Sequence, residues 1–119
     1  MEYKFEKLEV WNLAMKFNDL SYKLADSLPE HEKFNLASQL KRACTSIALN
    51  IAEGSTSQSD NEQARFLSYA IRSHVETVAC IRLMEARGYL AKHENVKQNF
   101  EVIGAELFNK LQAFKRAIN

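Results

Sequence analysis

The sequence predicts an all-α protein, an up-down-up-down antiparallel four-helix bundle. Only three glycines and one proline occur among its 119 residues, so few positions interrupt helices. Apolar residues recur at spacings of three and four, which places them on one face of a helix. Short breaks separate four segments, at about residues 8–28, 33–53, 60–87 and 94–118. Helices joined by short connections pack most simply as antiparallel neighbours, here as one domain over residues 1–119.

The first segment ends at a proline. Pro29 lacks a backbone N–H and disfavours helical geometry at Leu28, so we expect the helix to stop there. Its apolar positions follow the helical repeat and form one stripe: Val10, Leu13, Phe17, Leu20, Leu24 and Leu28. A second, flanking apolar strip contains Trp11, Ala14, Met15, Tyr22 and Ala25.

The second segment runs from about Lys33 to Glu53 and buries one stripe: Leu36, Leu40, Cys44 (or Ala43), Ile47 and Ile51. Gly54 follows it directly. Because glycine adopts the left-handed conformation that often ends a helix, we expect Gly54 at the C′ position.

The third segment begins with a helix-start signal. Ser59 and Glu62 have the spacing of a capping box, and Gly88 is expected to end the helix at the C′ position. The fourth segment keeps the three-and-four repeat to the end of the sequence, at Val96, Phe100, Ile103, Leu107, Leu111, Phe114 and Ile118. The first and third helices are apolar over more of their circumference than one core requires. This excess indicates either a subunit interface or a wide core stripe with scattered surface residues.

Composition excludes several classes of protein. The net charge is +1, so bulk charge gives no support for nucleic-acid binding. Cys44 and Cys80 lie in apolar stretches without metal-site spacing and are interpreted as buried, reduced thiols. No signal peptide opens the sequence, and no apolar run is long enough to span a membrane. We therefore expect a cytoplasmic protein without a membrane partner.

One set of polar residues could form a site. Arg42, Ser46, Asn50 and Glu53 share a ridge of the second helix, and Ser73 and Glu76 offer matching groups on the third. They predict either a ligand groove or, as the favoured interpretation, a buried or half-buried network that fixes helix register. In that network Arg42 pairs with Glu53 or Glu76, and Arg42→Ala costs on the order of 2 to 4 kcal/mol by leaving a carboxylate unpaired.

Residues for catalysis are not expected. The network lacks a nucleophile, and the three histidines are scattered at His31, His74 and His93 without convergent metal ligands. The glycines are isolated, so no phosphate-binding loop occurs. We expect neither an enzyme nor a cofactor.

Basic residues on the second and third helices give one possible nucleic-acid surface. It would consist of Lys41, Arg65, Arg72, Arg82 and Arg87. Acidic residues nearby dilute this charge in a single copy. In a ring of copies the same residues would repeat as a continuous track.

Three segments resemble one known family. They are Phe5–Trp11, Ser38–Ala43 and Ser46–Gly54, the last reading SIALNIAEG. The third helix also matches at Arg65-Phe66-Leu67 and at the positions Ala70, Ser73, Glu76 and Thr77. The family is the bacterial four-helix-bundle group encoded in intervening sequences of 23S ribosomal RNA genes, sometimes labelled S23 ribosomal protein. The resemblance covers about residues 5–90. This sequence has Arg72-Ser73 at a position where the family often has a Gly-Ser dipeptide.

The resemblance implies an up-down bundle that assembles as a homopentamer. Similar proteins include the accessory variability determinant of diversity-generating retroelements, which is pentameric and binds nucleic acid and a reverse transcriptase. The leading hypothesis is therefore a non-enzymatic oligomeric scaffold that associates with RNA or DNA. The alternative is a protein-protein interaction module without nucleic-acid contact.

Overall fold

The structure, a computed structural model, describes residues 1–118. Four helices carry the fold: α1 (Glu9–Asp26), α2 (Leu36–Gly54), α3 (Asp60–Ala86) and α4 (Glu94–Ile118). Two short 3-10 helices precede α1 and α2, at Lys4–Lys7 and Glu30–Glu32. The bundle measures 44 × 28 × 25 Å along its principal axes.

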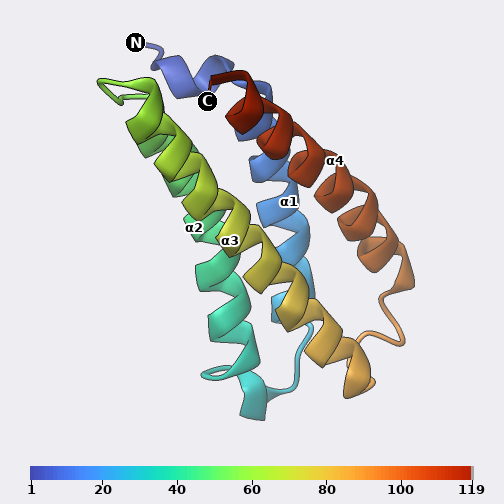
Figure 1. The fold of residues 1–119 in the computed structure, drawn as a ribbon. Coiled ribbons are helices and arrows are strands. Elements are labelled where there is room, and N and C mark those ends of the chain that lie inside the picture. Colours follow the sequence, from blue (N-terminus) through green and yellow to red (C-terminus); the bar gives the residue numbers. More distant parts are fainter. Residues whose placement is uncertain (119) are drawn as a thin grey trace.

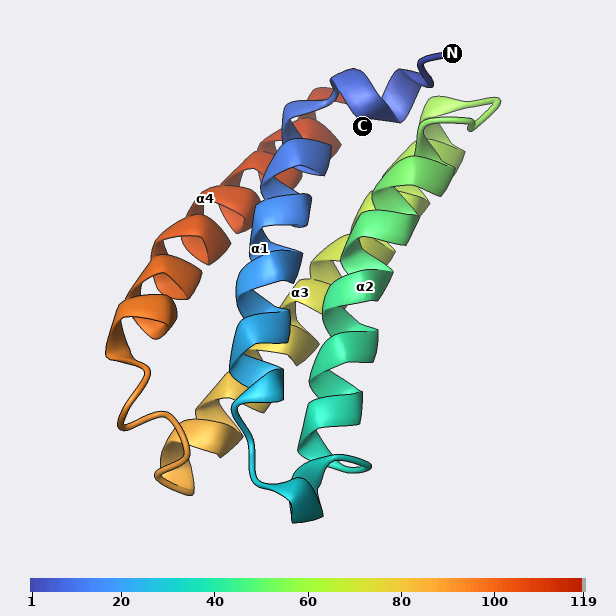
Figure 2. The same ribbon diagram turned by 180° about the vertical axis from the view of Figure 1, so that it is seen from behind.

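The helices alternate in direction. Each packs against its neighbours in the sequence, and α1 packs against α4 to close the ring of contacts. Both ends of the chain lie at one end of the bundle, together with the α2–α3 connection (Figures 1 and 2). The predicted up-down-up-down antiparallel four-helix bundle is confirmed.

One core draws residues from all four helices. The largest fully buried side chains include Phe17, Leu24, Leu40, Ile47, Ile51, Leu67, Ile81, Met84, Phe100, Leu107 and Leu111. Most of them are the stripe residues that the helical repeat indicates. Outside this core, the 3-10 helix at the N-terminus carries Phe5, whose ring meets Trp11 edge-on at 4.6 Å between centroids. This contact covers part of Trp11 in the first turn of α1.

The centre of the core is aromatic. The ring of Phe17 stacks on Phe100 at 4.6 Å and on His74 at 4.9 Å between centroids. Gly104 allows this arrangement, because a Cβ atom at that position would lie 2.7 Å from the Phe17 ring. The carbonyl of Gly104 lies 2.8 Å from Nε2 of His74. A carbonyl only accepts, so His74 donates from Nε2.

The connection before α2 differs from the expectation. The helix starts at Leu36 and not near Lys33, because Glu30–Glu32 forms a 3-10 turn and Asn35 has non-helical backbone angles. The side chain of Glu32 is buried and accepts hydrogen bonds from Asn35 (3.0 Å) and from the Tyr89 hydroxyl (2.9 Å). These bonds hold the turn in place.

His31 completes this cluster. Its Nε2 lies 3.3 Å from the Tyr89 hydroxyl oxygen. A tyrosine hydroxyl carries one hydrogen, which goes to Glu32, so His31 donates to Tyr89. We call Glu32, Asn35, Tyr89 and His31 the loop clasp, because it joins the α1–α2 connection to the α3–α4 connection. The hydrogen bond from Tyr89 is the main cause of a lowered pKa at Glu32.

The expectation for Gly54 is wrong, whereas that for Gly88 is confirmed. Gly54 is the last residue of α2, is buried, and does not have a positive φ. Its role is packing, because a Cβ atom there would lie 2.9 Å from Cβ of Phe66 on α3. Gly88 has φ +76° and ends α3 as expected. Ser59 caps α3 by accepting from the backbone N–H of Glu62 at 3.1 Å.

His74 makes the stability of the bundle depend on pH. Burial lowers the pKa of His74 below the value of about 6.5 expected in the unfolded chain. The unfolded state therefore binds a proton more readily than the folded state as pH falls through this range. We expect the free energy of unfolding to decrease below about pH 6.5, by up to about 1.4 kcal/mol per pH unit.

Urea denaturation between pH 7.5 and 5.5 measures this slope, with His74→Gln and His93→Gln as the variants to compare. The His74→Gln slope should be shallower than that of the parent, whereas His93→Gln should follow the parent. Equal slopes in the parent and in His74→Gln would contradict the assignment.

Candidate interaction surface

A neutral hydrogen-bond network joins α2 to α3. Asn50 donates from Nδ2 to the backbone oxygen of Ser46 at 2.8 Å and lies 3.1 Å from its hydroxyl. Ser73 on α3 donates to the Ser46 hydroxyl at 2.9 Å. Thr77 is fully buried and donates to the backbone oxygen of Ser73. The structure thus brings together three of the six residues assigned to the network: Ser46, Asn50 and Ser73.

The charged members of the predicted network lie outside it. Arg42, Glu53 and Glu76 are all exposed, and none has an ion pair within 4 Å among residues 1–118. Their positions explain this result, because the buried stripe of α2 follows Leu40, Ile47 and Ile51 on the opposite side of the helix. The expected buried pairing of Arg42, and the large stability loss derived from it, do not fit this geometry.

A surface hollow of about 520 Å³ lies beside this ridge, between α1 and α2. It is lined by Tyr22, Lys41, Arg42, Thr45, Ser46, Leu49, Asn50 and Glu53. Lys41 lies over the Tyr22 ring and pairs with Asp26 at 2.7 Å, and this hydrogen bond raises the pKa of Lys41. The lining supplies charge and hydrogen-bonding groups but no nucleophile paired with a base.

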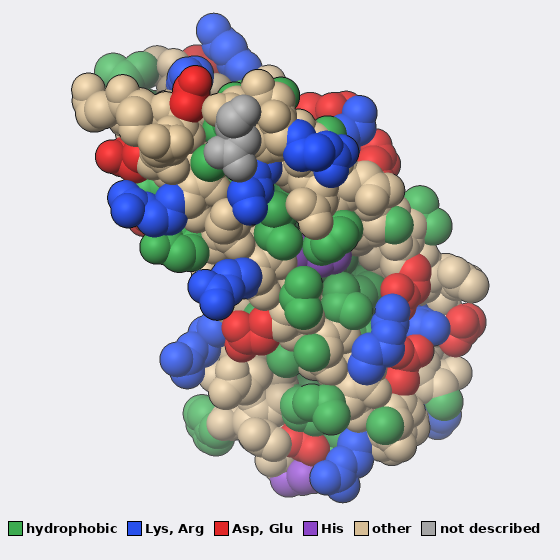
Figure 3. All heavy atoms as spheres, viewed as in Figure 1, with side chains coloured by type: hydrophobic (Ala, Val, Ile, Leu, Met, Phe, Trp, Pro, Cys, Tyr) green, Lys and Arg blue, Asp and Glu red, His purple; other side chains and the backbone are tan. Residues whose placement is uncertain are grey.

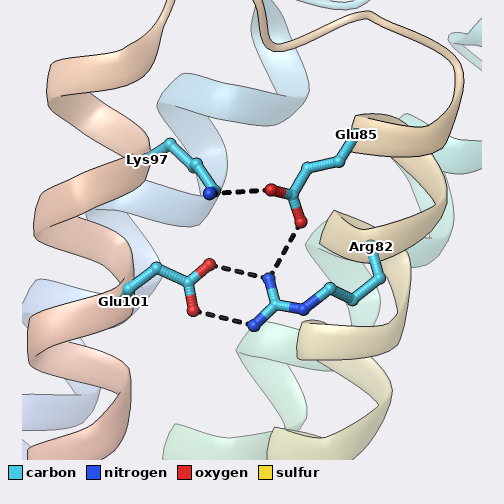
Figure 4. A network of polar contacts seen from close by, with 4 residues as sticks. All are labelled: Arg82, Glu85, Lys97 and Glu101. Carbon is cyan, nitrogen blue, oxygen red and sulfur yellow. Dashed lines mark hydrogen bonds and ion pairs between the residues drawn. The ribbon is translucent and has the colours of Figure 1, made fainter.

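Two of the five candidate nucleic-acid residues are neutralised within the chain. Lys41 has its pair with Asp26. Arg82 forms a two-point hydrogen bond with Glu101, at 2.7 and 2.9 Å, and also contacts Glu85 at 3.0 Å (Figure 4). Lys97 joins the cluster through Glu85 at 2.7 Å. The bond to Glu101 raises the pKa of Arg82, and the bond from Lys97 is the main cause of a lowered pKa at Glu85. This cluster ties α3 to α4.

The other three candidates remain accessible. Arg65, Arg72 and Arg87 are exposed, and the structure shows no ion pair for them in the part of the chain it describes. Arg65 and Arg72 are two turns apart on α3.

Large apolar side chains are exposed on the same helices. Leu49, Tyr69, Val75 and Leu83 are 54%, 41%, 55% and 57% exposed. They lie among the charged residues of α2 and α3, and we call this surface the α2/α3 face: Arg42, Leu49, Glu53, Arg65, Tyr69, Arg72, Val75, Glu76 and Leu83. Green, blue and red side chains alternate along the left side of Figure 3, where α3 runs in front of α2. On α1 the exposed apolar residues are Met15 and Tyr22.

Cysteine and histidine positions give no second site. Cys44 and Cys80 are free and buried, as expected, and burial raises the pKa of Cys44 to about 11. Residues 1–118 contain no group of three or more His, Cys, Asp or Glu side chains that could hold a metal ion. Over the same residues, no helix combines the length and the apolar character needed to cross a membrane.

Sequence reasoning missed His74, the loop clasp and the Arg82 cluster. Each depends on residues far apart in the chain: 30 residues for His74 and Gly104, 57 for Glu32 and Tyr89, and 19 for Arg82 and Glu101. Periodicity assigns a residue to a helix face. It does not give the register between two helices, which decides these pairs.

The fold and surface together define a small antiparallel four-helix-bundle protein that exposes large apolar side chains among charged residues on α2 and α3. The chain belongs to the 23S rRNA-intervening sequence protein family, whose model matches residues 6–109. The match confirms the resemblance and extends it beyond residue 90, into most of α4. A search of curated proteins found no match.

The Arg82 cluster, and not Arg42, should contribute to the stability of a single copy. At protein concentrations where the chain is monomeric, we expect Arg82→Ala to lower the free energy of unfolding by about 1 kcal/mol. Arg42→Ala should change it by less than about 0.5 kcal/mol, because its side chain is exposed and unpaired. Urea denaturation measures both. A loss for Arg42→Ala as large as that for Arg82→Ala would restore the buried-pair interpretation.

Proposed function

We propose that this protein is a non-enzymatic helical scaffold that assembles with copies of itself through the α2/α3 face. The observation that carries the proposal is the group of four large apolar side chains on this face, each between two fifths and three fifths exposed. Large apolar side chains that stay exposed on neighbouring helices are typical of interaction sites.

The charged residues on this face favour an interface of defined orientation over nonspecific apolar association. Arg42 and Glu53 lie along one ridge of α2, and Arg65 and Glu76 lie along one ridge of α3. These four residues have no ion pair within residues 1–118, so each can pair with a group on another molecule. Charges around an apolar centre set the orientation of an interface more than its affinity.

The assembly proposed is a closed ring of five copies, as the family resemblance implies. A ring requires a heterologous interface, in which one surface of each copy meets a different surface of the next. The α2/α3 face is suited to this geometry because its two ridges belong to different helices. The match to the family model over residues 6–109 supports the proposal, because the ring is what resemblance to this family implies.

Native mass spectrometry and light scattering from about 1 to 100 μM test the assembly. We expect a mass five times that of the 13.7 kDa chain, and we expect Leu49→Ser with Tyr69→Ser to give a monomer. Val102→Ser is the matched control, because Val102 is also exposed but lies on α4. A parent protein that stays monomeric at every concentration would contradict the proposal.

A second candidate function is association of the assembly with RNA or DNA. Arg72 and Arg87 favour it, since both are exposed and no carboxylate within residues 1–118 neutralises them. With a net charge of +1, one copy offers little attraction for phosphate. Repetition around a ring would multiply these two contacts.

Fluorescence anisotropy with single-stranded RNA, hairpin RNA and single-stranded DNA tests this function at about 50 and 200 mM salt. We expect salt-sensitive binding that is weakened by Arg72→Ala and Arg87→Ala. Arg82→Ala should bind like the parent, because the Arg82 charge is already paired with Glu101. If an assembled parent protein binds none of the three probes at low salt, the nucleic-acid function is excluded. The alternative of a protein-protein interaction module then stands.

A further inference from the structure

The charged residues of the α2/α3 face match one another in spacing. Arg42 and Glu53 are eleven residues apart on α2, and Arg65 and Glu76 are eleven residues apart on α3. Eleven residues correspond to about three helical turns and a rise of about 16 Å, so each pair lies on one ridge. Both ridges read from arginine to glutamate along the chain, and antiparallel alignment therefore places each arginine opposite a glutamate.

The apolar residues fit the same alignment. When Arg42 is placed opposite Glu76 and Glu53 opposite Arg65, the residue opposite Leu49 is Tyr69. Leu49 follows Arg42 by seven residues, and Tyr69 precedes Glu76 by seven. Both side chains are exposed in a single copy, at 54% and 41%. One register thus joins two ion pairs and one apolar pair.

We propose that α2 of one copy packs antiparallel against α3 of a second copy in this register. Arg42 then pairs with Glu76 of the second copy, Glu53 with Arg65 of the second copy, and Leu49 packs on Tyr69 of the second copy. This inference rests on the proposed self-assembly and names the contacts that produce it.

The packing within one copy sets the height of these contacts along the bundle. The Ser46–Ser73 hydrogen bond and the close approach of Gly54 to Phe66 align α2 and α3 of the same chain. By that alignment Arg42 and Glu76 lie at one level, and Glu53 and Arg65 at another, to within about two residues or 3 Å. Two copies can therefore form all the proposed contacts when they lie side by side with parallel bundle axes. Neither copy has to be shifted along its axis relative to the other.

Several charges elsewhere on the surface are already paired within the chain. Lys41 pairs with Asp26, Arg82 with Glu101, Lys97 with Glu85 and Lys110 with Glu9. The carboxylates and cations in these pairs are satisfied within the chain. Arg42, Glu53, Arg65 and Glu76 are exposed and have no such partner in the described residues, a property that Lys16, Arg72 and Arg87 share. What sets the four apart is their matched spacing on α2 and α3.

One competing arrangement satisfies the same charges. Packing α2 of one copy antiparallel against α2 of another would pair Arg42 with Glu53 at both ends. That register places Leu49 opposite Ser46. The Ser46 hydroxyl already accepts a hydrogen bond from the Ser73 hydroxyl. The α2–α3 arrangement instead places Leu49 on the Tyr69 ring, so it buries more apolar surface for the same number of ion pairs.

Charge reversal distinguishes these arrangements. The variants are Arg42→Glu, Glu76→Arg, the double variant Arg42→Glu with Glu76→Arg, and the double variant Arg42→Glu with Glu53→Arg. Analytical ultracentrifugation gives the dissociation constant for self-association of each. Circular dichroism verifies that each remains helical, as expected for exposed positions. Lys16→Glu is the control, because it reverses one exposed charge on α1.

We expect each single reversal to raise the dissociation constant at least about tenfold, since like charges then face one another. Arg42→Glu with Glu76→Arg should return it to within about threefold of the parent value. Arg42→Glu with Glu53→Arg should remain dissociated, and Lys16→Glu should assemble like the parent.

Recovery by Arg42→Glu with Glu53→Arg alone would overturn the α2–α3 pairing in favour of α2–α2 packing. A parent protein that assembles while neither single reversal changes the constant would also overturn it, and would leave the proposed self-assembly intact. A parent protein that is monomeric at every concentration would overturn both.

Discussion

The position of Phe17 is the constraint on which the bundle depends. Its ring meets Phe100 of α4 and His74 of α3, so one side chain of α1 contacts two other helices at the centre of the core. Gly104 brings the α4 backbone against that ring, where any larger residue would collide with it. The Gly104 carbonyl then lies within reach of the buried imidazole of His74. The spacing between α1, α3 and α4 is therefore set by the contacts of the Phe17 ring.

The polar groups divide between the two seams of α3. On the α4 side, the charges of Arg82, Glu85, Lys97 and Glu101 satisfy one another across the seam. On the α2 side, the contact is neutral: a hydrogen bond between the Ser73 and Ser46 hydroxyl groups joins the helices, the Asn50 amide bonds Ser46 within α2, and the nearby charged residues are exposed. A neutral seam leaves those charges free for contacts outside the chain. For this reason the α2 side, and not the α4 side, carries the proposed interface.

Much of the fold follows from local pattern, because burial of apolar residues on a helix has a fixed period. That period places all four helices and nearly all of the core. Gly54 shows the limit of the approach. A glycine after a helical stripe is typical of a C′ position, yet here it is needed for the approach of Phe66 from another helix. Arg42 shows a second limit, because spacing put it on the correct ridge but could not tell whether that ridge faces a carboxylate or solvent. Only the register between α2 and α3 decides that question.

The loop clasp makes the two ends of the bundle different in how they are held together. Viewed as two helical hairpins, α1–α2 and α3–α4, the molecule is fastened at one end by Tyr89, which bridges Glu32 and His31 across the two connections. The α2–α3 connection joins the hairpins covalently at the opposite end, beside both chain ends. The hairpins are thus held at both ends, once by a peptide link and once by hydrogen bonds. Because the α2–α3 connection is covalent, the hairpins can move apart only at the clasp end, where hydrogen bonds and side-chain packing hold them instead of a peptide link.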